Sequence, residues 1–228
     1  MVENGGEMEF SNSYELLEEL RKKELLKNKP KYWWPDAGTF EVVVGAVLTQ
    51  NTKWENVEKA LNQLKMKSEL CSSGRFSSGR DGEWRIEEVA SFEPSYLAEL
   101  IKSAGFYNQK AKRLIALSRN ILRDFGDFEN FKENVTREWL LSQKGIGFET
   151  ADSILCYACF KETMVMDAYT KRLLKKKGFE FESYDDMKEW FERGVEENWG
   201  KLAEIYENDL NLCYARFHGK IVEFMKNG

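Results

Sequence analysis

The sequence is short of residues that break helices or cross-link small folds. Its 228 residues include three prolines and four cysteines. Few prolines leave long stretches able to form helices. Four scattered cysteines cannot build the dense disulfide framework of a small secreted domain, and their number suits a reducing compartment.

Long apolar runs are also missing. No stretch approaches 18 consecutive apolar residues, and no apolar segment follows the Glu-rich N-terminus. The sequence therefore predicts no transmembrane helix and no signal or transit peptide. We expect a cytoplasmic monomer without a membrane partner.

Positive net charge is lacking too, because the formal net charge is -5. That balance alone argues against a nucleic-acid partner. The distribution differs: residues 105–177 hold 14 Lys and Arg against nine Asp and Glu, whereas 179–209 hold three against 11. A basic segment beside an acidic one fits a face that meets phosphates, and it also fits ordinary charged helix surfaces.

What the sequence does contain is Leu, Glu and Lys at spacings of three and four, which predicts an all-α fold. A stretch rich in Ser and Gly, 72–82, reads as a surface loop. The predicted helices span 13–27, 39–49, 54–64, 95–103, 108–125, 136–142, 148–160, 168–177, 184–198 and 200–225.

Cys156 and Cys159 form a C-x-x-C pair inside the apolar helical run 151–160. This spacing permits a metal or redox site. The alternative is that two small hydrophobic side chains, three residues apart, face one core.

Lys144-Gly145-Ile146-Gly147 separates two predicted helices. Two glycines around one apolar residue form a tight hairpin whose backbone N–H groups can bind a phosphate without reading sequence. The same turn can instead serve only to pack two helices closely.

Asp167 follows the apolar run Met164-Val165-Met166 and precedes a predicted helix. An Asp at such a junction is commonly an N-cap. If it also borders a cleft, its charge can stabilise the oxocarbenium-like sugar that forms when a glycosidic bond breaks, or orient a water for attack.

The spacing of hairpin and Asp167 resembles the endonuclease III family of helix-hairpin-helix DNA glycosylases. Further segments match it in order: 48–52 (Leu-Thr-Gln-Asn-Thr), 105–111 (Gly-Phe-Tyr-Asn-Gln-Lys-Ala) and 218–220 (His-Gly-Lys). The resemblance covers roughly 33–222 and implies that double-stranded DNA with damaged bases is the partner.

The resemblance implies a role for each matching residue. Asp167 would be the catalytic carboxylate. The hairpin, Lys144 with the amides of Gly145, Ile146 and Gly147, would grip a phosphate. Gln50 would fill the space left by a flipped nucleotide and Phe106 would wedge into the stack; the alternatives are a polar loop residue and a core aromatic.

Two departures from the family narrow the expected activity. Bifunctional members carry a nucleophilic Lys two residues beyond the second hairpin glycine, where this chain has Glu149, and Lys144 lies on the wrong side to replace it. The four closely spaced cysteines of the family's iron-sulfur cluster are missing after His218. We expect a monofunctional enzyme with no metal, cluster or cofactor; whether an alkali cation binds the hairpin carbonyls stays open.

A monofunctional member without a cluster is similar to bacterial 3-methyladenine DNA glycosylases. Trp33, Trp34, Pro35 and Trp54 could form an aromatic slot for an electron-poor base, or be plain core residues. Lys220 could lie at the pocket wall as a neutral, salt-bridged or covalently modified side chain. His218, the lone histidine, reads as a structural hydrogen-bonding residue.

The expected architecture has two helical lobes with the substrate cleft between them. The central barrel, 31–163, would carry the helix-hairpin-helix, and 1–30 with 164–228 would form the lobe bearing Asp167.

Two alternatives to this function stay open. One is a glycosylase for another lesion, such as mismatched thymine or uracil or an oxidised base; the other is a non-catalytic DNA-binding module.

Overall fold

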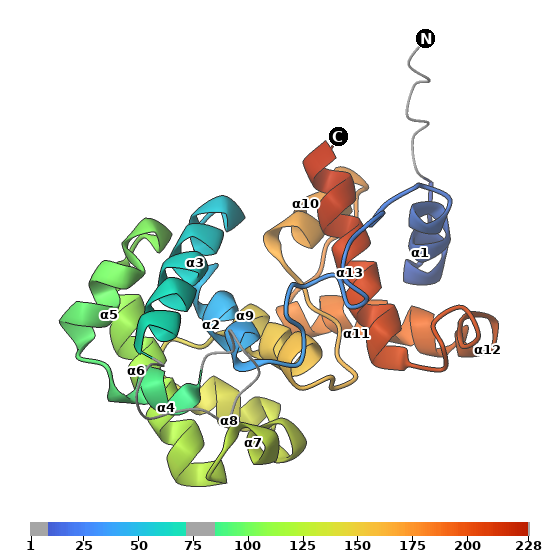
Figure 1. The fold of residues 1–228 in the computed structure, drawn as a ribbon. Coiled ribbons are helices and arrows are strands. Elements are labelled where there is room, and N and C mark those ends of the chain that lie inside the picture. Colours follow the sequence, from blue (N-terminus) through green and yellow to red (C-terminus); the bar gives the residue numbers. More distant parts are fainter. Residues whose placement is uncertain (1–8, 72–84, 228) are drawn as a thin grey trace. The chain divides into compact units, whose positions relative to one another are not determined.

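The computed structural model describes residues 9–71 and 85–227, and every regular element within these ranges is a helix (Figure 1). The all-α prediction is therefore confirmed. The loop predicted at 72–82 lies outside the described residues. No helix in the described ranges is long and apolar enough to cross a membrane.

The chain divides into two compact units, one made of 36–160 and the other of 1–35 with 161–228. The boundaries predicted from the sequence lie at 30/31 and 163/164. They shift because Trp33 packs on His218 and Asn211 donates a hydrogen bond to the carbonyl of Lys161, 2.6 Å away. Segments 31–35 and 161–163 thereby belong with the C-terminal helices.

The unit 36–160 is built around one buried helix, α2 (Phe40–Leu48), with eight of its nine residues buried. It packs against four helical elements that follow it in the chain, and Figure 1 shows it beside α3 and α9. The other elements are α3 (Trp54–Cys71), α4 (Ile86–Ser91), α5 (Pro94–Leu100), the 3-10 helix η1 (Lys102–Ala104), α6 (Tyr107–Phe125), α7 (Phe128–Asn134), α8 (Arg137–Ser142), α9 (Phe148–Ser153) and the π-helix η2 (Ile154–Ala158).

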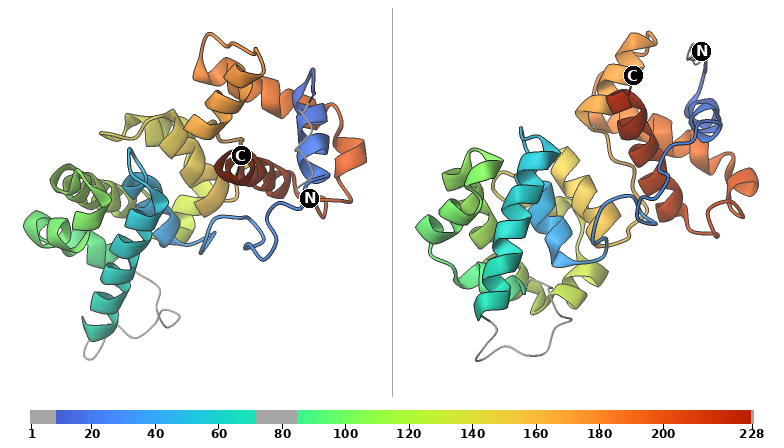
Figure 2. Two further views of the ribbon diagram at one scale, coloured as in Figure 1. Left: turned by 90° about the horizontal axis from the view of Figure 1, so that it is seen from above. Right: turned by 45° about the horizontal axis from the view of Figure 1, so that its top comes forward.

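The other unit centres on the C-terminal helix α13 (Leu210–Asn227), which packs against α1 (Ser13–Arg21) and α10 (Ala168–Lys176). Both views of Figure 2 show α10 and α13 side by side. The unit also contains α11 (Tyr184–Glu196) and α12 (Trp199–Leu202). A core of buried Leu, Met, Phe and Tyr side chains joins these helices.

The helices differ from those predicted in three ways. The helix predicted at 200–225 is broken, because Glu207 and Asn208 adopt positive φ angles of 57° and Asp209 accepts a hydrogen bond from the Leu212 N–H, 2.9 Å away. The first helix ends at Arg21 rather than at 27. Helices α4 and α7 were not predicted, since each has only six or seven residues and too few turns to show a period.

Candidate active site and nucleic-acid interface

Asp167 is the N-cap of α10. Its Oδ1 accepts hydrogen bonds from the backbone N–H of Thr170 at 2.7 Å and the Thr170 hydroxyl at 2.9 Å. The preceding buried run is held in place at Met164, whose N–H donates to Glu192, and at Met166, whose N–H donates to the Tyr184 hydroxyl. Oδ1 thus caps the helix, and Oδ2 takes no part in that cap.

That second oxygen, Oδ2, lies 3.6 Å from Nε2 of His218, and the Asp167 side chain is 13% exposed. Burial raises the pKa of the Asp167 carboxyl, but the neighbouring His218 and the two Thr170 donors outweigh burial, and the net effect lowers that pKa. Asp167 is therefore an ionised carboxylate at neutral pH.

His218, which faces Asp167, also contacts the Trp33 ring. Their ring centroids are 5.2 Å apart at 81°, an edge-to-face contact. The Trp33 ring also lies on Gly219, where a Cβ would come within 2.4 Å of the indole. Gly219 therefore permits the indole to approach α13 next to the histidine.

The other expected base-pocket aromatics divide between the two units. Trp34 is buried and meets Trp33 edge to face, with centroids 6.2 Å apart, while Pro35 is exposed. Trp54 begins α3 in the unit 36–160 and is partly buried. Trp33 thus contacts both Trp34 and His218 within one unit.

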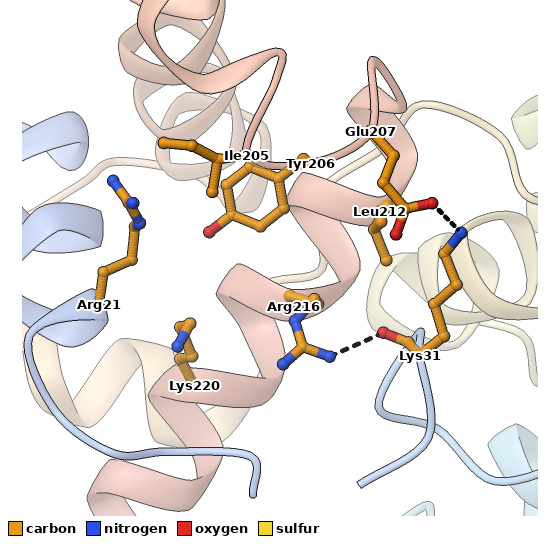
Figure 3. Close-up of a pocket in the computed structure, with 8 residues that line it drawn as sticks. All are labelled: Arg21, Lys31, Ile205, Tyr206, Glu207, Leu212, Arg216 and Lys220. Atoms are coloured by element: carbon orange, nitrogen blue, oxygen red, sulfur yellow. Dashed lines mark hydrogen bonds and ion pairs between the residues drawn. The ribbon is translucent and has the colours of Figure 1, made fainter.

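Lys220 does not join that group. It lines a cavity of about 260 Å³ together with Arg21, Arg216 and Tyr206, and neither Asp167 nor Trp33 contributes to its walls (Figure 3). The reason is helical geometry: two residues along α13 turn a side chain by about 200° from the His218 face.

The residues around Lys220 bear on whether its side chain is neutral, salt-bridged or modified. Burial, and then the charges of Arg216 and Arg21, lower its pKa. Its ammonium forms no ion pair with a carboxylate among the residues the structure describes, so the salt-bridged alternative was wrong. Figure 3 shows that Glu207, in the same cavity, pairs instead with Lys31.

The glycine hairpin has the geometry of an exposed turn. Gly145 has a φ of 83°, and a Cβ there would come within 2.3 Å of the Arg113 guanidinium. The Ile146 side chain is buried, and its N–H donates to the carbonyl of Gln143 at 3.1 Å. The N–H groups of Gly145 and Gly147 donate to no described residue. These two amides, rather than all three, suit an external acceptor.

Gln50 is bonded to the hairpin. Its amide nitrogen donates to the Gly145 carbonyl and to the Thr150 hydroxyl, each at 3.0 Å. Its amide oxygen accepts from Arg113 at 2.9 Å. The hairpin and the Gln50 loop are therefore one hydrogen-bonded assembly.

Phe106 has the features of an exposed wedge. Its ring is 66% exposed, and its φ of 46° is in the left-handed region, which non-glycine residues rarely occupy. The alternative of a core aromatic was wrong. A strained residue that exposes an apolar ring is typical of a site that binds something.

The residues flanking the hairpin are exposed: Lys144 on one side and Glu149, in the first turn of α9, on the other. Cys156 lies in η2 and Cys159 directly follows it, and both side chains are buried, which favours the core interpretation of the C-x-x-C pair. Among the described residues, no group of three or more His, Cys, Asp and Glu could hold a metal ion.

Sequence reasoning missed the connections between the loops. Arg113 looks like any surface cation of an amphipathic helix, yet it links Gln50 to the hairpin. His218, interpreted from the sequence as a structural hydrogen-bonding residue, faces Asp167; the sequence did not indicate that partner. The spacing of three between Lys110 and Arg113 was the available signal, since it places both side chains on one side of α6.

Known proteins are similar to this chain in sequence and fold. The family model described as HhH-GPD superfamily base excision DNA repair protein matches residues 44–213. The crystal structure of the Helicobacter pylori 3-methyladenine DNA glycosylase MagIII, bound to 1,N6-ethenoadenine, is similar with a TM-score of 0.87 and 53% identity. It matches over 95% of this chain and 98% of that chain.

Two more distant proteins are also similar to this chain. A putative DNA repair glycosylase of Methanocaldococcus jannaschii is 40% identical over 94% of this chain and 89% of its own length. A trapped endonuclease III–DNA covalent intermediate, 17% identical, shares the fold with a TM-score of 0.61 over 94% of this chain and 86% of that chain. The chain belongs to the HhH-GPD superfamily of base excision DNA repair proteins and is a DNA glycosylase.

Proposed function

We propose that this protein is a monofunctional glycosylase that removes 3-methyladenine and related alkylated purines from double-stranded DNA by hydrolysing the N-glycosidic bond. The observation that carries the proposal is the Asp167 carboxylate. It is ionised, caps its own helix, and faces the His218 ring, which in turn contacts Trp33.

The chemistry needs little more than that carboxylate. Loss of an N3-alkylated adenine leaves positive charge on the sugar, and an adjacent anion stabilises that charge or orients a water. Because the alkylated base is already cationic, it departs without a proton from a general acid. His218 would then hold Asp167 in its charged form.

The choice of base rests on the aromatic residues. An electron-poor, cationic ring is attracted to the faces of indoles, and Trp33, which contacts Trp34 and His218, belongs to the same unit as Asp167. The relative with 53% identity is described as a 3-methyladenine glycosylase bound to an etheno-modified adenine. We therefore favour a modified purine over a mismatched pyrimidine.

Access to a paired base requires flipping, and the exposed loops supply the parts. Gln50 would fill the space that the nucleotide leaves, while Phe106 would enter the stack. The amides of Gly145 and Gly147 would hold a phosphate, with exposed Lys144 adding attraction to the strand.

We also propose that strand cleavage is absent. Schiff-base chemistry needs an amine at the reacting sugar carbon, and the corresponding position is Glu149. Water therefore remains the nucleophile, and the product is an abasic site in an intact strand.

The test is release of free bases from methylated duplex DNA, compared with duplexes that contain mismatched thymine, uracil or an oxidised purine. Borohydride is added to parallel reactions to trap any Schiff base. We expect release of 3-methyladenine and no trapped adduct. Release of a pyrimidine in its place would overturn the specificity, and a trapped protein–DNA adduct would overturn the hydrolytic mechanism.

A further inference from the structure

Lys110 is a buried lysine that the proposed mechanism does not use. It lies in the first turns of α6 and is 1% exposed. Its ammonium donates to the Leu48 carbonyl at 2.8 Å, the Ala104 carbonyl at 2.8 Å and the Thr52 hydroxyl at 2.7 Å. Three acceptors match the three N–H donors of an ammonium.

The three acceptors belong to the two loops expected to enter the duplex. Leu48 ends α2 and Thr52 lies two residues beyond Gln50, so both frame the Gln50 loop. Ala104 lies two residues before Phe106. The Thr52 hydroxyl also contacts the Ala104 carbonyl at 2.5 Å. One ammonium therefore joins the bases of both loops.

Burial excludes the usual role of a lysine in a DNA-binding protein. An ammonium with all three donors directed at interior oxygens cannot also contact a phosphate. Burial, and then the charge of Arg113, lower the pKa of Lys110 to about 8, so the ammonium is still mostly protonated at neutral pH. Burying a charge is costly unless hydrogen bonds compensate for the lost water, so the ammonium depends on all three acceptors.

We propose that Lys110 is a positioning residue for base flipping: it fixes the Gln50 loop and the Phe106 loop to each other so that both enter the duplex as one rigid element. The inference rests on the proposed function, in which Gln50 and Phe106 replace the flipped nucleotide. It assigns Lys110 no contact with DNA. Its effect should therefore fall on the extrusion of a paired base rather than on attraction to phosphates.

The experiment compares Lys110→Met with Lys112→Met. Methionine keeps a long unbranched side chain and removes the ammonium. Lys112 lies on the same helix, is exposed, and loses the same charge. Base release is measured as kcat/KM on methylated duplex DNA and on the same DNA as separated single strands, which need no extrusion from a pair.

We expect Lys110→Met to lower kcat/KM on the duplex about tenfold, as for a lost set of buried hydrogen bonds, and on single strands less than about twofold. Lys112→Met should change both substrates by one common factor. Thr52→Val removes one acceptor at smaller structural risk and should cause a smaller loss confined to the duplex. It replaces Lys110→Met if that variant does not fold.

Equal losses on both DNA forms would overturn the inference, because a merely structural lysine acts on every substrate alike. An undiminished duplex rate in Lys110→Met would overturn it as well. If the wild-type protein releases no methylated base from either form, the proposed function fails first and the inference falls with it. That pattern differs from an active wild type with an unaffected variant.

Discussion

At the scale of single residues, Asp167 serves both helix and reaction. Its Oδ1 caps α10 and its Oδ2 faces His218. Asparagine caps helices about as well as aspartate, so the two tasks can be separated. Replacing Asp167 by Asn removes the negative charge, so it should impair base release, which needs an anion, and spare the helix cap, which does not.

We therefore predict that Asp167→Asn lowers base release at least about 100-fold, while the free energy of unfolding changes by less than about 1 kcal/mol. Base release and thermal unfolding measure the two effects. The control is Asp127→Asn, since Asp127 caps α7 in the same manner and should leave base release unchanged. Wild-type release by Asp167→Asn would show that the charge of Asp167 takes no part in base release.

Gly219 is a position where a larger side chain would disturb the contact between Trp33 and His218. Alanine is the better helix former by about 1 kcal/mol, yet a Cβ at this position would come within 2.4 Å of the Trp33 ring. We predict that Gly219→Ala moves the indole off His218, destabilises the protein and lowers base release about tenfold. Unfolding midpoints and release rates report both changes.

Gly200→Ala is the matched control, because that helical glycine has no neighbouring atom within 4 Å of the added Cβ. It should stabilise the protein slightly. A Gly219→Ala variant as stable and active as Gly200→Ala would show that the Trp33 contact does not matter.

At the scale of elements, the turn between α8 and α9 depends on both a backbone angle and a neighbour. Gly145→Ala introduces strain at a φ of 83° and drives a Cβ into Arg113. We predict a loss of about 1–2 kcal/mol in stability and about a tenfold loss of duplex affinity, as Arg113 is displaced from Gln50.

Gly126→Ala separates these two causes. Gly126 has a φ of 84° and no neighbour within 4 Å of a Cβ, so it carries the strain alone and should bind duplex DNA normally. Denaturant unfolding and duplex titration distinguish the two variants. Equal affinities would mean that the Arg113–Gln50 bond does not support DNA binding.

The start of α6 should also respond to pH. Lys110 has a pKa lowered to about 8 in the folded protein, whereas an unfolded chain keeps a lysine protonated up to about 10.4. Between these values the unfolded state binds more protons, so this residue makes stability rise with pH. We predict that the free energy of unfolding of the wild type, relative to Lys110→Met, increases from pH 7.5 to 10. A flat difference would contradict the lowered pKa.

At the scale of the whole molecule, an acidic protein has to meet a polyanion through local charge. Its net charge is -5, yet residues 105–177 carry an excess of cations. Attraction to phosphates releases counterions, so affinity for undamaged duplex should fall linearly on a log–log plot against salt.

We predict that Lys144→Gln, beside the hairpin, reduces the slope of that plot by about one. Lys201→Gln, in the acidic segment 179–209, should leave the slope unchanged although it removes the same charge. Fluorescence anisotropy at several salt concentrations measures both. Identical slopes for the two variants would argue that the hairpin does not meet the strand.

Sequence alone was enough for the all-α fold class and for the order of the sites along the chain. The periodic spacing of apolar residues is a local property, and so are the Gly-Ile-Gly turn and an N-cap such as Asp167. The family resemblance followed from several such local signals in one order. None of these inferences required knowing which distant residues meet.

Contacts between distant segments were decided only by the tertiary structure. Lys110 reads as one more surface cation until the interior oxygens of Leu48, Thr52 and Ala104 surround it. From the sequence, Lys220 is expected at the wall of the base pocket, but the turn of α13 directs it to the cavity lined by Arg21 and Arg216. Burial and pairing depend on residues far away along the chain, so no periodicity within a single segment reveals them.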